Sequence, residues 1–103
     1  MIYPPNREFP RQRVIAVDFD GTLFRKEGCL NEGVAAWCRK KKSEGFQMIL
    51  WSARGREICE RAVVAFGLVG VFDHVLSKPG YILDDKGWSW IKYTHVVKPS
   101  DQI

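Results

Sequence analysis

The stretch VIAVDFDGTL, residues 14–23, decides the fold. Its first part, residues 14–17, is a short apolar run rich in β-branched side chains, typical of a strand buried on both faces of a parallel sheet. The run stops at Asp18-Phe19-Asp20-Gly21, where two acids stand two residues apart and a glycine permits a sharp turn. We therefore expect a buried strand that ends in a pair of carboxylates.

Working outward, helix-like and strand-like stretches alternate. A helix is predicted between Asn31, a good N-cap, and Gly45, a good terminator, and a second from Ile58 to Gly67. The predicted later strands are Phe46–Trp51, Phe72–Leu76, Tyr81–Leu83 and Thr94–Val97. This order predicts an α/β fold, a three-layer, Rossmann-like parallel sheet with helices on both faces.

The 103 residues suit one domain, which we place at residues 13–103 behind an extended, proline-containing arm over residues 1–12. The formal net charge of +4 fits an anionic substrate and leaves nucleic acid open as a partner. The basic run at residues 39–42 is either a solvated helix end or a patch that steers phosphate.

Three cysteines without close spacing favour free thiols in a reducing, cytoplasmic compartment. The longest apolar run, residues 62–72, is well short of the ~20 residues that a membrane helix needs, so no membrane span is expected. His74 and His95 lack zinc-ligand spacing. The aromatic residues Trp88, Trp90 and Tyr93 fit core or interface packing, or else a platform on which a base or sugar stacks.

Polar residues follow several predicted strands at their carboxyl ends, where ligands bind in such sheets. They include Asp18, Asp20, Ser52 and Asp84, which should meet at one rim of the sheet. One carboxylate of the first pair could attack phosphorus while the other protonates the departing oxygen.

Several acids at one rim would repel each other, and a divalent cation such as Mg²⁺ would relieve that repulsion. Asp84 and Asp85 would contribute to such a site, although adjacent acids also fit a solvated turn. Ser52, with backbone N–H groups after it, could hold a phosphate oxygen or could simply cap a helix. Lys78 is either a solvated lysine or a source of positive charge for the phosphoryl group.

The segment Asp18-Phe19-Asp20-Gly21-Thr22-Leu23 resembles the first motif of the haloacid dehalogenase superfamily, D-x-D-G-T-[LV]. Leu50-Trp51-Ser52, Lys78-Pro79 and Asp84-Asp85 are similar to its second, third and fourth motifs, in the right order.

The resemblance implies a role for each matching residue. Asp18 would be the nucleophile and a Mg²⁺ ligand, and Asp20 the acid and base, with its backbone carbonyl on the metal. Ser52 and Ala53 would bind phosphate, and Lys78 would stabilise the phosphoryl charge. Asp84 would ligate Mg²⁺, with Asp85 assisting. The segment from Phe24 to Leu30 would form a flap.

Only 31 residues separate Asp20 from Ser52, and 25 separate Ser52 from Lys78, which leaves no room for a cap domain. The expected function is therefore that of a small, capless, Mg²⁺-dependent phosphomonoesterase that works through an aspartyl-phosphate. Two alternatives stay open: a phosphatase of a macromolecule, such as a nucleic-acid end or a phosphoprotein, and a non-enzymatic interaction module. Arg54 and Arg56 are surface residues or contacts to the leaving group. A homo-oligomer that covers a sheet edge is a further expectation.

Overall fold

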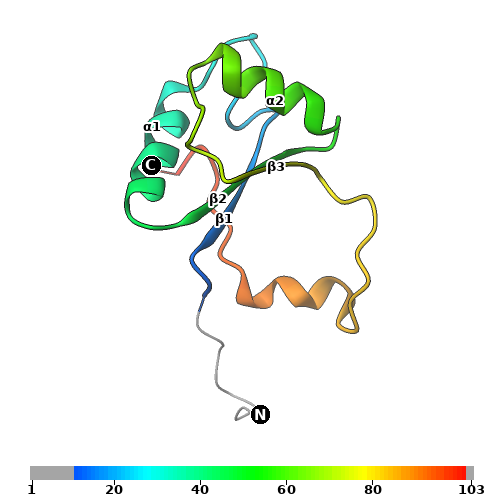
Figure 1. The fold of residues 1–103 in the computed structure, drawn as a ribbon. Helices are drawn as coiled ribbons and strands as arrows, with labels where there is room; N and C mark the ends of the chain where they lie inside the picture. Colours follow the sequence, from blue (N-terminus) through cyan, green and yellow to red (C-terminus); the bar gives the residue numbers. More distant parts are fainter. Residues whose placement is uncertain (1–10, 102–103) are drawn as a thin grey trace.

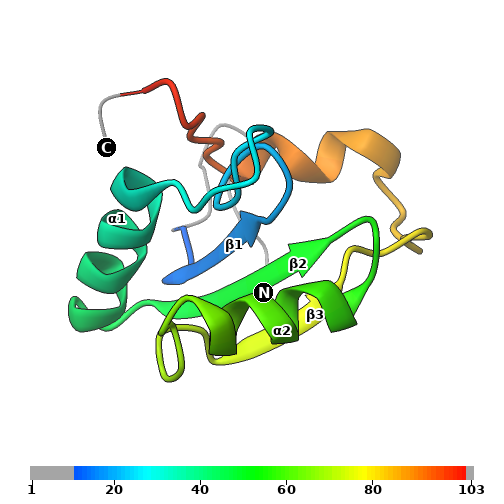
Figure 2. The same cartoon turned by 90° about the horizontal axis from the view of Figure 1, so that it is seen from above.

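The computed structural model describes residues 11–101, and its secondary-structure elements follow the predicted alternation (Figure 1). They are β1 (Val14–Asp18), α1 (Glu32–Ser43), β2 (Gln47–Ser52), α2 (Arg56–Ala65), β3 (His74–Ser77) and a 3₁₀ helix, η1 (Gly87–Tyr93). The strands form one parallel sheet in the order β1-β2-β3, seen side by side in Figure 2. The α/β class is confirmed. The arm predicted over residues 1–12 lies outside the described residues, apart from its last two positions.

Helix α1 begins and ends where the sequence predicts. The side chain of Asn31 accepts a hydrogen bond of 3.2 Å from the backbone N–H of Val34, which satisfies one donor of the first turn. Gly45 follows the last turn with a φ of 93°, a left-handed conformation in which an L side chain is strained. The basic run at residues 39–42 lies at this C-terminal end, where Lys42 pairs with Asp73 and Lys41 with Glu44. It is therefore a helix end, remote from the carboxyl ends of the strands.

One face of the sheet is covered and carries the core. Along β2, Met48, Leu50 and Ser52 are fully buried, whereas the alternate side chains of Ile49 and Trp51 are only half-buried. The buried side chains of α1 and α2 join those of β1 and β2 in a single apolar cluster. Its fully or almost fully buried members include Val34, Ala35, Cys38, Cys59 and Leu68.

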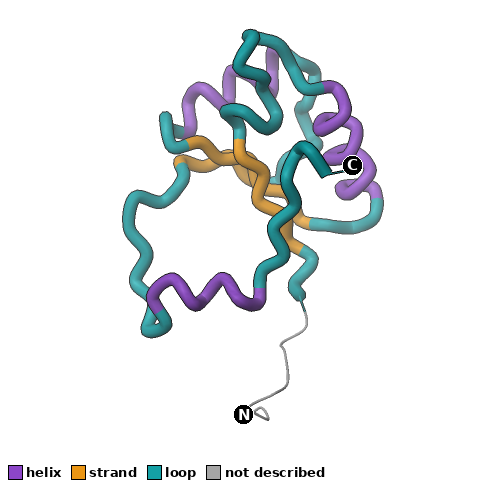
Figure 3. Tube along the Cα trace, turned by 180° about the vertical axis from the view of Figure 1, so that it is seen from behind, coloured by secondary structure: helices purple, strands orange, loops and turns teal. Residues whose placement is uncertain are grey.

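Both α-helices lie over this same face, and η1 lies on the other side of the sheet (Figures 1 and 3). Parallel strands in sequential order, joined by crossovers of one hand, place their helices on one side. The prediction that β1 is buried on both faces is therefore wrong: Val14 is 44% exposed and Ala16 is exposed. No Cα atom of η1 comes within 8 Å of a strand or of α1 and α2, so residues 11–101 do not build the second helical layer.

The two last predicted strands are not formed. Tyr81 and Leu83 are 99% and 105% exposed, and neither Tyr81–Leu83 nor Thr94–Val97 pairs with a strand. A short apolar run satisfies the local preference for a strand, but a strand also needs a neighbour that supplies hydrogen bonds. Trp88, in η1, is 82% exposed and takes no part in the core. None of the helices in residues 11–101 has the length and apolarity that a membrane crossing requires.

The covered face should carry most of the stability. Leu50 is completely buried at the centre of the core, so Leu50→Ala should lower the free energy of unfolding by about 2–5 kcal/mol. Val64 lies on α2 but is 73% exposed, and Val64→Ala should change it by less than about 0.5 kcal/mol. Urea denaturation followed by circular dichroism measures both. Equal effects of the two substitutions would contradict the placement of the core.

Candidate functional site

The carboxyl ends of the three strands meet at one rim of the sheet. Asp18, at the end of β1, pairs in register with Trp51, and Ser52, at the end of β2, pairs with Ser77 of β3. Lys78 follows directly, and its backbone N–H donates a hydrogen bond of 2.9 Å to the carbonyl of Ser52. The strand register thus brings three of the predicted residues, 60 positions apart at the extremes, to one place.

Asp18 and Lys78 are in contact on this rim. The Nζ of Lys78 lies 3.4 Å from Oδ1 of Asp18 and over the ring of Trp51, 6.0 Å from its centroid. The hydroxyl of Thr22 donates to Oδ2 of Asp18 over 3.3 Å. The short connection after β3 therefore does not keep Lys78 from the site, because the lysine needs no loop to reach it.

The tight turn after β1 holds both acids in place. Phe19 continues the ladder to β2 with a 3.0 Å bond to the carbonyl of Trp51, and its side chain is buried. Gly21 has a φ of 78°, and Leu23, fully buried, donates back to the carbonyl of Asp18. Two apolar side chains thus anchor the turn in the core while Asp18 and Asp20 remain accessible.

Beyond this turn, the predicted flap starts and ends on the core. Phe24 and Leu30 are partly buried and form an isolated antiparallel bridge. The ring of Phe24 stacks on that of Phe19 at 5.3 Å between centroids. The residues between them, 25–29, form the exposed part of the loop. The flap is thus a short loop fixed at both ends.

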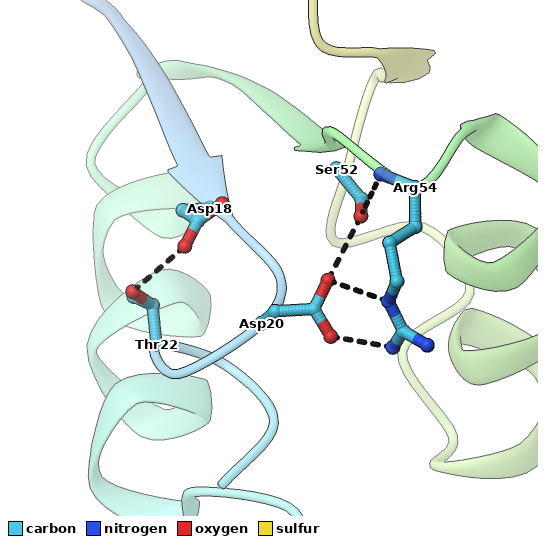
Figure 4. A network of polar contacts seen from close by, with 5 residues as sticks. All are labelled: Asp18, Asp20, Thr22, Ser52 and Arg54. Atoms are coloured by element: carbon cyan, nitrogen blue, oxygen red, sulfur yellow. Dashed lines mark hydrogen bonds and ion pairs between the residues drawn. The ribbon is translucent and has the colours of Figure 1, made fainter. Parts of the chain in front are cut away.

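Asp20 accepts three side-chain hydrogen bonds from the turn that follows β2 (Figure 4). The hydroxyl of Ser52 and Nε of Arg54 each donate to its Oδ2 over 3.0 Å, and a terminal nitrogen of Arg54 donates to Oδ1. The backbone N–H of Arg54 in turn donates to the Ser52 hydroxyl over 3.0 Å. The hydrogen bond from Arg54, assisted by that from Ser52, lowers the pKa of Asp20 below its ordinary value of 3.8 and outweighs the effect of burial.

The turn between β2 and α2 contains the other predicted phosphate contact, Ala53. Ala53 is exposed, and its backbone N–H donates to no residue in the described part of the chain. Gly55 has a φ of 110°, and the first N–H group of α2, that of Arg56, donates to the hydroxyl of Ser77 over 3.0 Å. The turn therefore offers a free N–H beside Ser52.

Asp84 and Asp85 are not gathered with the other acids. Asp84 sits in an exposed turn, where its Oδ1 accepts a 2.8 Å hydrogen bond from the backbone N–H of Lys86. Within residues 11–101, no group of three or more His, Cys, Asp or Glu side chains is arranged to hold a metal ion. The expected convergence of Asp84 depended on the strand at Tyr81–Leu83, which the structure does not form. Its role as a ligand stays a prediction.

The three cysteines are free thiols, and two of them, Cys38 and Cys59, are buried. Cys59, on α2, is fully buried. Burial, followed by the negative charges of Asp20 and Asp18, raises the pKa of its thiol to about 11. The thiol is therefore protonated at neutral pH and serves as part of the core beneath the rim.

Sequence reasoning did not find the contacts that Thr22 and Arg54 make with the two acids. Thr22 belongs to the motif at residues 18–23 without a predicted role, and for Arg54 the sequence leaves both a surface position and a leaving-group contact open. The available signal was the place of Arg54, two residues after Ser52 in the turn that faces Asp20. No family model matches the sequence, and the searches of curated proteins and of solved structures return no significant match.

The pair between Arg54 and Asp20 makes a prediction about protonation. Arg54→Gln should raise the pKa of Asp20 towards 3.8, as measured by carboxyl ¹³C NMR during an acid titration. Because the folded pKa is lowered, the pair adds stability above the unfolded pKa and loses it as the pH falls through the folded value. Arg56→Gln is the control, since Arg56 pairs with Glu60 at 2.7 Å. An unchanged Asp20 pKa in the Arg54 variant would contradict the assignment.

Proposed function

We propose that this protein is a Mg²⁺-dependent phosphomonoester hydrolase of the haloacid dehalogenase type, in which Asp18 forms an aspartyl-phosphate. The observation that carries the proposal is the pair of acids at the end of β1, with the cation of Lys78 3.4 Å from the first of them. Carboxylate nucleophiles form such phosphorylated intermediates, and a cation beside them stabilises the transferred group. The resemblance of residues 18–23 to the superfamily's first motif supports the same conclusion.

In the first step, a carboxylate oxygen of Asp18 attacks phosphorus, and the bond from phosphorus to the leaving-group oxygen breaks. Asp20 is ionised in the free protein, because Arg54 lowers its pKa, so it takes up a proton from solvent when substrate binds and then gives that proton to the leaving-group oxygen. In the second step, water attacks phosphorus and gives a proton back to Asp20, while the bond between Asp18 and phosphorus breaks. Inorganic phosphate leaves, Asp20 releases its proton to solvent, and both carboxylates are restored.

The other rim residues position these two acids and the phosphoryl group. Thr22 orients the carboxylate of Asp18, and Lys78 neutralises charge on the transferred phosphoryl oxygens. The Ser52 hydroxyl can donate one hydrogen bond, and in the free protein it donates that bond to Asp20. The backbone N–H of Ala53 is therefore the first phosphate contact, and the Ser52 hydroxyl joins when Asp20 is protonated and turns away.

The rim suits a Mg²⁺ ion that is bound together with substrate. Such ions are held by one or two carboxylates, several waters and substrate phosphate oxygens. Asp18 and the backbone carbonyl of Asp20 would hold it, and it would polarise the phosphoryl oxygens. Asp84 lies six residues after Lys78, a length that spans up to about 20 Å when extended, so it can reach the rim as a further ligand. Asp85 would assist through water.

The site is open to solvent, which suits a phosphate on a small molecule or on an exposed part of a macromolecule. The side chains of Asp18 and Lys78 are 36% and 42% exposed. Helices α1 and α2 cover the core face of the sheet and form no cap over the rim (Figure 2). Selectivity must therefore come from residues beside the rim rather than from an enclosing domain.

Removal of the nucleophile is the main test. Asp18→Asn should lower Mg²⁺-dependent turnover of an aryl phosphate by at least ~10³-fold, because an amide cannot form the phosphorylated intermediate. Thermal unfolding should show that the variant is still folded. Asp101→Asn, which changes an exposed acid near the C-terminus, should keep full activity. Full turnover by the Asp18 variant would remove Asp18 from this role, and the proposal with it.

The metal ligands are tested by a titration. Asp84→Asn should raise the Mg²⁺ concentration for half-maximal turnover by about tenfold or more, because it removes one charged ligand. Calorimetric Mg²⁺ binding in the presence of inorganic phosphate provides a second measurement. An unchanged Mg²⁺ requirement would show that Asp84 is not a ligand.

A further inference from the structure

In the described part of the chain, the two acids after β1 each pair with a different cationic side chain. Lys78 contacts Asp18, and Arg54 contacts Asp20 through two of its nitrogens. Figure 4 shows the carboxylate of Asp18 turned towards Thr22 and that of Asp20 turned towards Ser52 and Arg54. The two acids thus lie in separate environments, with Lys78 beside Asp18 and Arg54 beside Asp20.

The ion pair between Arg54 and Asp20 can open at small cost, which leaves Arg54 able to bind another anion. The side chains of Arg54 and Asp20 are 58% and 41% exposed, and ion pairs at such positions contribute little to stability. The backbone N–H of Arg54, by contrast, is fixed on the buried Ser52 hydroxyl. The root of the side chain is therefore held in place, while its guanidinium can leave Asp20 at small cost.

A guanidinium in this position matches a phosphate as well as it matches a carboxylate. Its planar array of N–H donors forms paired hydrogen bonds with two oxygens of either group. Asp20 occupies Nε and one terminal nitrogen of Arg54 in the free protein. An anionic group that arrives next to Asp20 would take over these donors.

We propose that Arg54 binds a second anionic group, which the leaving group of the substrate carries. This inference rests on the proposed function, in which Asp20 protonates the leaving-group oxygen. Arg54, beside Asp20, then lies on the leaving-group side, and Lys78, beside Asp18, lies on the side of the transferred phosphoryl group. The substrate class is a phosphomonoester with another phosphate close to the reacting one.

Two anions test this assignment in metal-free buffer: inorganic phosphate, which has one anionic group, and methylenebisphosphonate, which has two and is not hydrolysed. Calorimetry should show that Arg54→Gln weakens binding of the bisphosphonate by about tenfold or more and that of phosphate by less than about threefold. Arg56→Gln, whose side chain is engaged by Glu60, should change neither. Equal losses for both anions in the Arg54 variant, or no loss, would overturn the proposal.

A double-mutant comparison separates this role from a merely structural ion pair. Asp20→Asn releases the guanidinium, so bisphosphonate should bind more tightly than to the wild type. That gain should be several-fold larger when Arg54 is present than in the Arg54→Gln background, where only the lost negative charge of Asp20 acts. Equal gains in both backgrounds would show that Arg54 does not take part in binding.

The second phosphate can belong to a small bisphosphate or to the neighbouring phosphodiester of a nucleic-acid end. A 5′-phosphorylated dinucleotide in the same assay distinguishes them: an Arg54-dependent loss for the dinucleotide assigns the nucleic-acid end, and a loss for the bisphosphonate alone assigns the small molecule. If inorganic phosphate still binds but neither the bisphosphonate nor the dinucleotide binds more weakly to the Arg54 variant, the role of Arg54 is overturned and the proposed function is not. Failure of the wild type to bind phosphate, together with full turnover by Asp18→Asn, overturns the proposed function as well.

Discussion

The parallel register of three short strands is the constraint on which the rest of the structure depends. Asp18 stands opposite Trp51, and Ser52 stands opposite Ser77, so the chain leaves all three strands at one level. The polar contacts of the rim depend on this common end of the three strands. A one-residue slip of β1 against β2 would turn Val17 out of the core and would move Asp18 away from Lys78. Packing of the apolar face therefore fixes the chemistry of the rim as well as the fold.

The sequence predicts the secondary structure well up to Lys78, where the local pattern of residues and the packing of the core agree. Asn31 and Gly45 bound α1, the apolar run before Asp18 forms β1, and Asp18, Ser52 and Lys78 meet as the strand ends require. The part after Lys78 was predicted less well, because its short apolar runs specify a strand only when a neighbour is present. Tyr81–Leu83 has the composition of a strand, yet it stays exposed and unpaired.

The contacts of individual side chains are harder to predict from a sequence pattern. Whether Arg54 points to solvent or to Asp20 depends on the turn between β2 and α2, where Gly55 adopts a φ of 110°. In the same turn, the backbone N–H of Arg54 donates to the Ser52 hydroxyl. Residue types and spacing indicate the candidate acids, but the geometry of the turn between β2 and α2 brings Arg54 to Asp20.

The pairing of each acid with a cation also affects the electrostatic field that a ligand in solution meets. Within the two ion pairs, two negative and two positive side chains lie close together, so these four side chains add little to the field beyond the rim. These four side chains therefore contribute little to drawing a charged ligand in from a distance. Under the proposed function, an anion would be selected at contact, by whether it is a better partner for Arg54 or Lys78 than the acid beside each of them.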